Sequence, residues 1–394
     1  MRAVTLRLVE LRALFFFDPA ARLRFLRRRM VELPAENSGG RAVRWWLLSA
    51  FTASLALASS AWVQPEWKGM SGWKQPAPAA AVAMPGIPAP TMERATPGQA
   101  PEATGVWLVE TNSQFELYSN GLRVETRFAA STTPRRYLAF PRMPGAGRGK
   151  WRTEPAGIVF HTTESHMAPF EAGQNSVLKR AGEGLLDFVR RNRSYHFVID
   201  RFGQVYRVVR ESDYANHAGN SVWADESWIY INLNQSFIGV AFEAQTRPEA
   251  GQFTANEAQV HAARVLTEML RARYRIAAAN CVTHAQVSVN PDNLLAGYHT
   301  DWVTGLPFGD LGLIDNYSAP LPSVALFGFG SDVLLAEAGG SPLTAGIQAA
   351  NEQVRREARE RGLTEVRYRQ ILHARYKQSL AALSAQANYQ ESPE

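Results

Sequence analysis

Two short apolar stretches of the sequence each end on a histidine. Residues 157–164 read GIVFHTTE, so that three apolar residues run directly into His161. Residues 279–284 read ANCVTH and end on His284. Short apolar runs of this kind predict buried strands, and imidazole nitrogen is one of the ligands that zinc prefers. The two strand ends therefore predict a zinc site, although a histidine also occurs where a strand simply reaches the surface.

A third ligand is expected from the chain that follows His284. This stretch reads HAQVSVNPDN, and Asp292 lies in the loop that its Asn-Pro pair starts. A loop carboxylate can fold back towards a strand-end histidine, and carboxylate oxygen also binds zinc. We therefore expect Asp292 to complete the site. His299 and Asp301 are close enough in sequence to compete with it for this position.

Cys281 precedes His284 by three residues, a spacing that resembles a zinc-binding pair. Residues three apart on a strand point to opposite faces, so we do not expect these two side chains to converge. As the single cysteine of the chain, Cys281 also excludes an internal disulfide.

Strand patterns occupy the chain on both sides of the first histidine. Residues 105–140 alternate apolar and polar side chains, and the Asn120-Gly121 pair is a strong hairpin signal. Residues 194–209 predict a second hairpin that turns near its glycine, and residues 237–243 predict a buried strand. The sequence therefore predicts a small β element followed by a domain built on a sheet.

A helix is predicted between the last of these strands and the second histidine. It covers residues 254–274 and opens with Thr254 and Glu257, which have the spacing of a capping box. Its buried side is expected to carry Ala262, Val265, Leu266, Met269 and Leu270.

Two more helices are predicted beyond residue 312. The first opens at Ser341-Pro342 and runs to Gly362. The second carries an apolar stripe, beside which His373 is expected to be structural; the stripe consists of Tyr368, Leu372, Tyr376, Leu380 and Leu383. We expect these helices to pack on the domain or on a protein partner rather than to carry chemistry.

The net charge of +6 is concentrated at the N-terminus. Residues 1–44 contain ten arginines and four acidic residues, and the rest of the chain carries 32 basic and 32 acidic residues. Residues 45–63 follow with nineteen uncharged, mostly apolar residues and tryptophans near both ends. This length is close to the ~20 residues needed to cross a bilayer. The basic segment therefore indicates membrane topology rather than a nucleic-acid partner.

The arginines before residues 45–63 predict a cytoplasmic N-terminus and an extracytoplasmic C-terminus. The small residues of ALASSA would suit a signal peptidase, but the long lead before them favours an uncleaved anchor in the cytoplasmic membrane. Residues 64–104 hold eight of the 22 prolines and predict an extended linker. The domain beyond the linker is thus expected to be periplasmic or extracellular.

Residues 155–308 resemble the zinc-dependent N-acetylmuramoyl-L-alanine amidases, whose fold is shared with the peptidoglycan recognition proteins and the phage lysozyme-type amidases. The matching stretches are GIVFHTTE, SYHFVIDRFGQVY, NHAGNS, FIGVAFE and VTHAQVSVNPD. They occur in the order of the family, with a helix between the last two, and cover about two fifths of the chain.

The resemblance implies a mixed α/β fold in which helices flank a central, mainly antiparallel sheet. It assigns zinc ligation to His161, His284 and Asp292. The implied substrate is peptidoglycan or a released muropeptide, cut at the amide between N-acetylmuramic acid and L-alanine. Zinc would polarise the carbonyl of this amide and activate water near neutral pH.

The resemblance also implies further site residues. Tyr195 corresponds to the tyrosine that some branches use in catalysis, and Thr162, His217 and Asn290 fall where substrate is expected to bind. Two positions depart from the family. Ala241 replaces a glutamate and Asn290 replaces a lysine. Glu243 lies on the same strand face as Ala241 and is the residue expected to substitute for that glutamate.

Six segments are therefore expected, and two other functions remain open. The alternatives are a non-catalytic peptidoglycan-binding module and a zinc peptidase of another specificity. The segments are a basic cytoplasmic segment (1–44), a transmembrane anchor or signal (45–63), a linker (64–104), a small β element (105–150), a zinc amidase domain (151–312) and a C-terminal helical extension (313–394).

Overall fold

The computed structural model describes residues 105–143, 149–165, 168–246 and 254–390. The predicted basic segment, membrane span and linker lie outside these residues. Within the described ranges, no helix combines the length and the apolar character needed to cross a bilayer.

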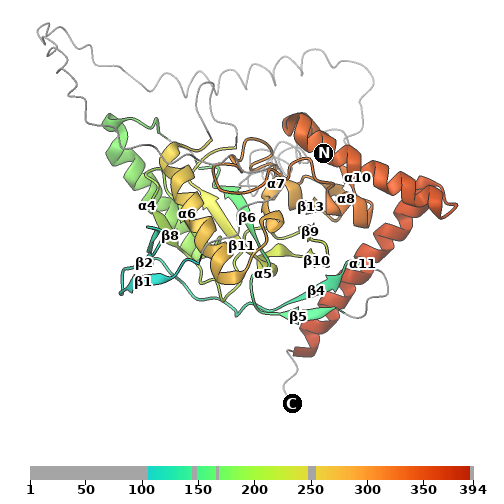
Figure 1. The fold of residues 1–394 in the computed structure, drawn as a ribbon, viewed down its shortest axis with the longest axis horizontal. Coiled ribbons are helices and arrows are strands. Elements are labelled where there is room, and N and C mark those ends of the chain that lie inside the picture. Colours follow the sequence, from blue (N-terminus) through green and yellow to red (C-terminus); the bar gives the residue numbers. More distant parts are fainter. Residues whose placement is uncertain (1–104, 144–148, 166–167, 247–253, 391–394) are drawn as a thin grey trace, which may run out of the picture. The chain divides into compact units, whose positions relative to one another are not determined.

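The centre of the fold is a mixed sheet of eight strands (Figure 1). The four strands around the histidines, β7, β11, β6 and β12, pair in parallel, as do β3 and β8. Only β1–β2, β2–β3 and β7–β8 are antiparallel. In spatial order the strands are β1 (Leu108–Thr111), β2 (Phe115–Tyr118), β3 (Arg123–Glu125), β8 (Val205–Arg207), β7 (Phe197–Ile199), β11 (Phe237–Phe242), β6 (Gly157–Thr162) and β12 (Cys281–Thr283).

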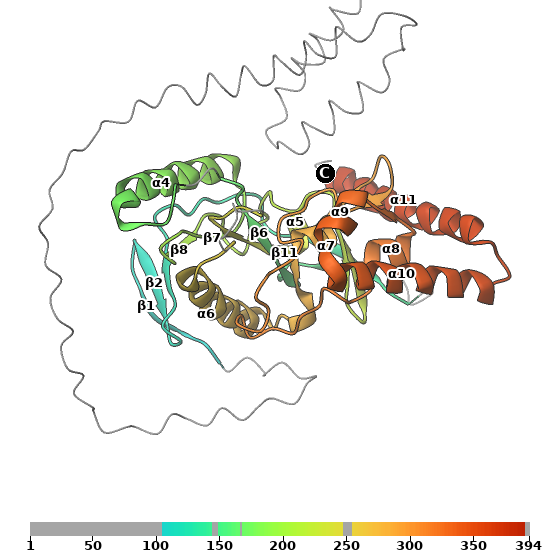
Figure 2. The same ribbon diagram turned by 90° about the horizontal axis from the view of Figure 1, so that it is seen from above.

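The expectation of a mainly antiparallel sheet is therefore wrong, whereas the mixed α/β class is confirmed. Parallel strands require a long crossover, usually through a helix. The chain passes through α4 (Asn175–Asn192) between β6 and β7, and through α6 (Glu257–Tyr274) between β11 and β12. These two helices cover opposite faces of the sheet (Figure 2).

Each helix buries one apolar side against the sheet. Leu186 and Val189 of α4 pack with Val198 and Ala241, while Leu266 of α6 joins a cluster with Phe160, Val240 and Phe242. Four of the five predicted core residues of α6 are buried, and Val265 is half-buried. The predicted cap is wrong by two residues, because the capping box is formed by Asn256 and Gln259 rather than by Thr254 and Glu257.

Both predicted hairpins are present. Gly121, with φ 84°, lies in the turn between β2 and β3, and Gly203, with φ 79°, lies in the turn between β7 and β8. Glycine adopts positive φ without steric cost. Gly203 has a second constraint, because a Cβ at this position would lie 2.6 Å from the carbonyl oxygen of Ala258. This close approach fixes the β7–β8 turn against the start of α6.

Two smaller sheets flank the central one. They are a four-stranded sheet of β5 (Lys150–Arg152), β4 (Tyr137–Pro141), β10 (Trp228–Ile231) and β9 (Val222–Ala224), and a three-stranded sheet of β13 (Val289–Asn290), β14 (Leu295–Ala296) and β15 (Gly330–Ser331). Short helices lie next to these strands in the chain: α5 (Leu233–Ser236) follows β10, α7 (His284–Val287) precedes β13, α8 (Pro322–Phe327) precedes β15 and α9 (Val333–Ala338) follows β15. The antiparallel pair β13–β14 is important for the site, because it separates His284 from the carboxylate described below.

The C-terminal helices α10 (Gly340–Glu360) and α11 (Glu365–Gln390) pack on α8 and on each other. Leu343 and Ile347 of α10 belong to the same hydrophobic cluster as Phe160 of β6. The predicted stripe of α11 faces inward, since Tyr368, Leu372 and Tyr376 are buried and Leu380 and Leu383 are partly buried. His373 has its Nε2 2.9 Å from the carbonyl oxygen of Gly328, in agreement with the predicted structural role.

Candidate metal centre

The structure brings three potential metal ligands together at the carboxyl end of β6. His161 Nδ1 lies 3.0 Å from Asp301 Oδ2, and His284 Nδ1 lies 2.8 Å from Asp301 Oδ1. The ring centroids of the two histidines are 4.5 Å apart. All three side chains are buried, and one ligand atom from each lies within 4.8 Å of the others.

Parallel pairing explains why the two histidines meet. Phe160 of β6 is paired with Thr283 of β12, and the next residue of each segment is its histidine, so His161 and His284 lie side by side. Hydrogen bonds also hold the segment of Asp301 and Trp302 to the segments of both histidines. The amide of Ala285 donates to the carbonyl oxygen of Asp301 at 3.2 Å, and Trp302 Nε1 donates to the carbonyl oxygen of His161 at 3.0 Å.

Asp301 occupies the position that the sequence analysis gave to Asp292. Asp292 is exposed, and its amide donates to the side chain of Asn290 at 3.0 Å within the turn between β13 and β14. Strand pairing of β13 with β14 carries this turn away from the histidines and brings the chain back afterwards. The expected ligand Asp292 is therefore corrected, because the rival carboxylate Asp301 is the one that reaches the histidines. The expected substrate contact of Asn290 stays a prediction.

The electrostatics of the group suit a cation. Burial, and next the neighbouring His284, lower the pKa of His161 to about 4, so this ring is neutral at pH 7. Burial by itself would raise the pKa of Asp301, but the neighbouring His284 outweighs it and helps to hold that pKa well below its usual range. Neutral imidazole nitrogen and ionised carboxylate oxygen are the forms that bind zinc.

The spacing of the donor atoms also fits zinc. Ligand atoms about 2.0–2.1 Å from one tetrahedral ion lie roughly 3.3 Å apart, close to the distances of 2.8–3.1 Å that separate Asp301 from the two Nδ1 atoms. His284 Nε2 is buried without a hydrogen-bond partner among the described residues. The three side chains therefore fit a catalytic zinc site, in which three protein ligands leave one position open.

Tyr195 lies beside this group. Its ring centroid is 5.1 Å from that of His161, and its backbone has a φ of 60°, which is unusual for an aromatic residue. Burial, followed by the charges of Asp301 and Glu164, raises the pKa of Tyr195 well above its usual value. The tyrosine also lines a cavity of about 320 Å³ together with Thr163, Ser165, Ala181, Leu185, Phe188, Val189 and Ser194.

Glu243 does not reach the group through any contact among the described residues. Its Oε2 accepts from the amide of Arg201 at 2.9 Å, and a Cβ on Gly182 of α4 would be 3.5 Å from the same oxygen. Glu243 is 1% exposed, and its Oε1 lacks a hydrogen-bond partner among the described residues. The contacts of Glu243 thus lead to the Arg201 loop and α4 rather than to the histidines.

The predicted substrate contacts Thr162 and His217 are both buried. The Thr162 hydroxyl is hydrogen-bonded to the side chains of Glu164 and Thr246. The His217 ring lies between His161 and the β11 strand, with Nδ1 3.1 Å from His161 Nε2 and Nε2 3.2 Å from the carbonyl oxygen of Phe237. Both ring nitrogens of His217 are therefore used inside the protein.

Cys281 points away from the group, as its position on the strand predicts. It is buried in the cluster that contains Ile158 and Phe160, and burial raises the pKa of its thiol to about 12. A zinc-binding cysteine must lose this proton. Cys281 is therefore a core residue.

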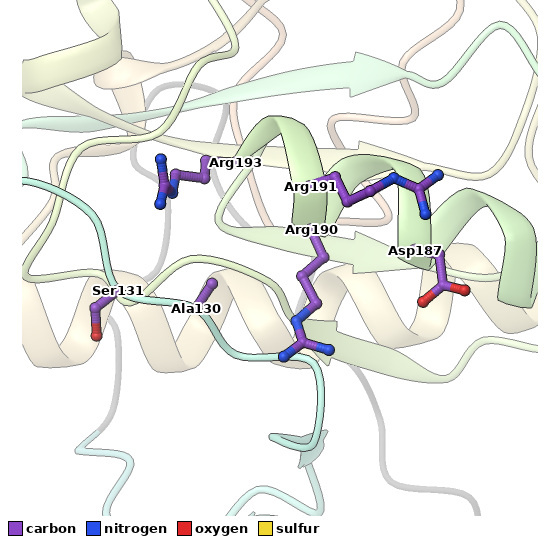
Figure 3. Close-up of a pocket in the computed structure, with 6 residues that line it drawn as sticks. All are labelled: Ala130, Ser131, Asp187, Arg190, Arg191 and Arg193. Atoms are coloured by element: carbon purple, nitrogen blue, oxygen red, sulfur yellow. The ribbon is translucent and has the colours of Figure 1, made fainter.

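A second cavity, of about 430 Å³, lies at the C-terminal end of α4 (Figure 3). Arg190, Arg191 and Arg193 line it with Asp187, Ala130 and Ser131. None of the predicted site residues lines this cavity. Basic side chains at a helix C-terminus stabilise the helix dipole, which accounts for Arg190 and Arg191.

His299 and Asp301, which the sequence offered only as rivals to Asp292, both lie at the site. The His299 ring stacks on that of His284, with centroids 4.4 Å apart and an interplanar angle of 18°. The available sequence signal is the closely spaced pair His299 and Asp301. Both residues follow the β13–β14 hairpin, whose two paired strands bring the chain back to the point where the hairpin begins. Trp302, which holds the backbone of His161, had no signal in the sequence.

A buried His-His-Asp group at the carboxyl edge of a mixed sheet defines a candidate metal-dependent hydrolase. The comparison with protein families agrees with this class. Residues 151–301 match the model of the N-acetylmuramoyl-L-alanine amidase family, so the resemblance inferred from the motifs of this segment is confirmed. No curated protein matches the sequence.

Several solved structures are similar to part of the chain. AmpDh3 from Pseudomonas aeruginosa, in complex with anhydromuramic pentapeptide, is 23% identical with a TM-score of 0.28, and the match covers 43% of this chain and 64% of that one. AmiD from E. coli, in complex with an anhydro-N-acetylmuramic acid peptide, is 20% identical with a TM-score of 0.32, covering 54% and 82%. The Drosophila peptidoglycan recognition protein SD is 18% identical with a TM-score of 0.27, covering 42% and 85%. The match thus spans just under two thirds of the AmpDh3 chain.

Proposed function

We propose that this chain is a zinc-dependent N-acetylmuramoyl-L-alanine amidase that acts on peptidoglycan or its muropeptides outside the cytoplasmic membrane. The observation that carries the proposal is the buried group of His161, His284 and Asp301 within the segment that matches the amidase family. The proposed substrate bond is the amide between N-acetylmuramic acid and L-alanine.

Zinc, held by His161, His284 and Asp301, would supply a Lewis acid for the scissile carbonyl and activate water near neutral pH. The neutral His161 ring and the ionised Asp301 are ready for this role, because neither has to change its protonation state at pH 7. Tyr195 keeps its proton, since its pKa is raised. Its hydroxyl therefore serves as a hydrogen-bond donor to the oxygen on which negative charge develops.

The leaving amine must gain a proton from a side chain near the group. His299 stacks on His284 and lies two residues before Asp301, which is the position of the family's lysine once Asp301 is taken as the third ligand. An imidazole has a reference pKa near 6.5 and transfers protons effectively at neutral pH. We assign the general-acid role to His299.

One observation favours a second candidate function. Ala241 is paired with His161 in the sheet, at the position where many family members carry a glutamate. A non-catalytic peptidoglycan-binding module would tolerate this loss. Such a protein would bind muropeptides without cutting them, so a test of cleavage separates the two functions.

The deciding experiment is a digest of purified sacculi and of defined muropeptides with the full-length, zinc-loaded protein. The expected products, identified by mass spectrometry, are stem peptides with a free L-alanine amine and glycan or sugar without peptide. Release of fragments cut within the peptide would indicate a peptidase instead. Binding to sacculi without any product would support the recognition module.

The same digest tests the role of Tyr195. Tyr195→Phe removes the hydroxyl but keeps the ring beside His161, so zinc content should be unchanged while turnover falls on the order of 10²-fold. Turnover equal to that of the wild-type protein would show that another group stabilises the developing charge.

A further inference from the structure

A buried hydrogen-bond chain connects His161 to the backbone of β11 through His217. His161 Nε2 lies 3.1 Å from His217 Nδ1, and His217 Nε2 lies 3.2 Å from the carbonyl oxygen of Phe237. His217 is 9% exposed and His161 is 1% exposed. This series of hydrogen bonds begins at His161, one of the three candidate zinc ligands, and ends on the Phe237 carbonyl oxygen of the central sheet.

The donor and the acceptor in each of these hydrogen bonds follow from the last bond, which ends on the Phe237 carbonyl oxygen. A carbonyl oxygen can only accept a hydrogen bond, so His217 Nε2 must carry the proton. A neutral imidazole has one N–H group, and the nitrogen opposite is then an acceptor. His217 Nδ1 therefore accepts from His161 Nε2, which leaves the lone pair of His161 on Nδ1.

The His217 ring has to be neutral for this assignment, and its surroundings ensure it. The ring lies edge-on to His161 and His196, with centroids 5.2 Å and 5.5 Å away. The buried guanidinium of Arg135 donates to the same carbonyl oxygen of Phe237, at 3.2 Å. A positive charge on the buried His217 ring would lie close to this buried guanidinium, which makes the charged form unfavourable.

The tautomer of His161 determines which atom faces Asp301 at the candidate metal site. His161 Nδ1, with its lone pair, lies 3.0 Å from the carboxylate oxygen of Asp301, so two electron-rich atoms face each other. This arrangement is unfavourable unless a cation lies between them. The hydrogen-bond chain therefore presents His161 in the tautomer that binds a metal through Nδ1.

Two further features hold His217 in place. A Cβ at Gly239 would lie 2.6 Å from His217 Cγ, so the ring can pack against β11 only because residue 239 is glycine. The side-chain oxygen of Asn234 accepts from the amides of residues 217, 218 and 219 at 2.8, 2.6 and 3.0 Å. The loop and the strand thus fix both the position and the orientation of the ring.

We propose that His217 is a positioning residue. It donates a hydrogen bond to the Phe237 carbonyl oxygen and accepts one from His161 Nε2, and it thereby fixes the tautomer in which His161 binds zinc. The inference rests on the proposed function, because it requires zinc at His161. It replaces the predicted contact of His217 with substrate. Neighbours that orient a metal-binding histidine typically contribute 10–100-fold to metal affinity.

The test compares the zinc affinity of full-length variants by competition with a chromophoric chelator. His217→Phe keeps a ring but removes both nitrogens, and it should weaken zinc binding by about 10–100-fold. His217→Asn places an acceptor oxygen near the position of Nδ1 and should retain most of the affinity. His373→Phe, which removes a histidine hydrogen-bonded to a carbonyl group in the C-terminal helices, is the matched control and should bind zinc like the wild-type protein.

A measurement on the wild-type protein covers the case in which His217→Phe fails to fold. With ¹⁵N-labelled histidine, the NMR spectrum of the zinc-loaded protein should show protons on Nε2 of both His161 and His217. A proton on His217 Nδ1, or unchanged zinc affinity in a folded His217→Phe protein, would overturn the inference. A wild-type protein that binds no zinc would instead refute the proposed function.

Discussion

Asp292 lies in the turn of one small hairpin and Asp301 follows that hairpin, and only Asp301 faces the histidines. Asp301 Oδ1 and Oδ2 lie 2.8 and 3.0 Å from His284 and His161, whereas Asp292 is exposed in the turn. Asp301→Asn should therefore lose bound zinc and activity, because a neutral amide is a poor substitute for an ionised carboxylate ligand. Asp292→Asn is the matched control and should keep both.

Metal analysis of the two purified variants provides the measurement. Equal zinc content in the two proteins would contradict the assignment of Asp301. Loss of zinc in Asp292→Asn alone would restore the ligand set expected from the sequence.

The histidine ligands could be predicted from the sequence, while the carboxylate could not. His161 and His284 each stand at the carboxyl end of a short, mostly apolar strand pattern, and this pattern is local in the chain. Asp301 reaches the site only because β13 and β14 pair and return the chain, which is a tertiary event. The position of His217 depends on its close approach to Gly239, which no sequence period encodes.

At the scale of elements, Glu243 connects the end of β11 to the Arg201 loop and to α4. Burial raises the pKa of Glu243 to about 7, and only the amide of Arg201 hydrogen-bonds to its side chain among the described residues. The folded protein therefore holds this proton more tightly than the unfolded chain does. Between pH 4.5 and about 7 the unfolded chain has lost the proton and the folded protein has not, so the free energy of unfolding falls as the pH rises.

We expect Glu243→Gln to remove this part of the pH dependence. The shift corresponds to a loss of roughly 3 kcal/mol in the wild-type protein between pH 4.5 and pH 8, and the variant should lack it because glutamine does not titrate. Denaturant unfolding of both proteins at pH 5 and pH 8 gives the comparison. If the difference in stability between them is the same at both pH values, Glu243 does not hold a raised pKa.

The elements themselves were largely visible in the sequence, but their directions were not. Alternation and glycine turns located the hairpins at Gly121 and Gly203, and the helical period located α6. Whether strands run parallel depends on how α4 and α6 cross the sheet, and that is decided by packing. The helix cap moved from Thr254 to Asn256, a small error typical of helix ends.

At the scale of the whole molecule, we propose that residues 45–63 anchor the protein in the cytoplasmic membrane with the amidase domain outside. The proposal rests on the ten arginines before this segment and on its uncharged length. Protease added to spheroplasts should cut within the linker of residues 64–104 and release the domain. Complete protection would refute the topology, and a mature N-terminus near Ser59 would refute only the uncleaved anchor.

The hydrophobic core continues from β6 into α10, beyond the segment that matches the amidase family. Trp302, Phe308, Tyr317 and Leu343 all lie beyond residue 301, the end of the family match, yet they belong to the same cluster as Phe160. A gene fragment that stops at residue 301 would encode a protein in which core side chains such as Phe160 lose part of their packing and become exposed to water. Exposed apolar surfaces of this kind promote aggregation. The amidase segment is therefore not an interchangeable cassette, and recombination or expression cloning would have to carry the C-terminal helices with it.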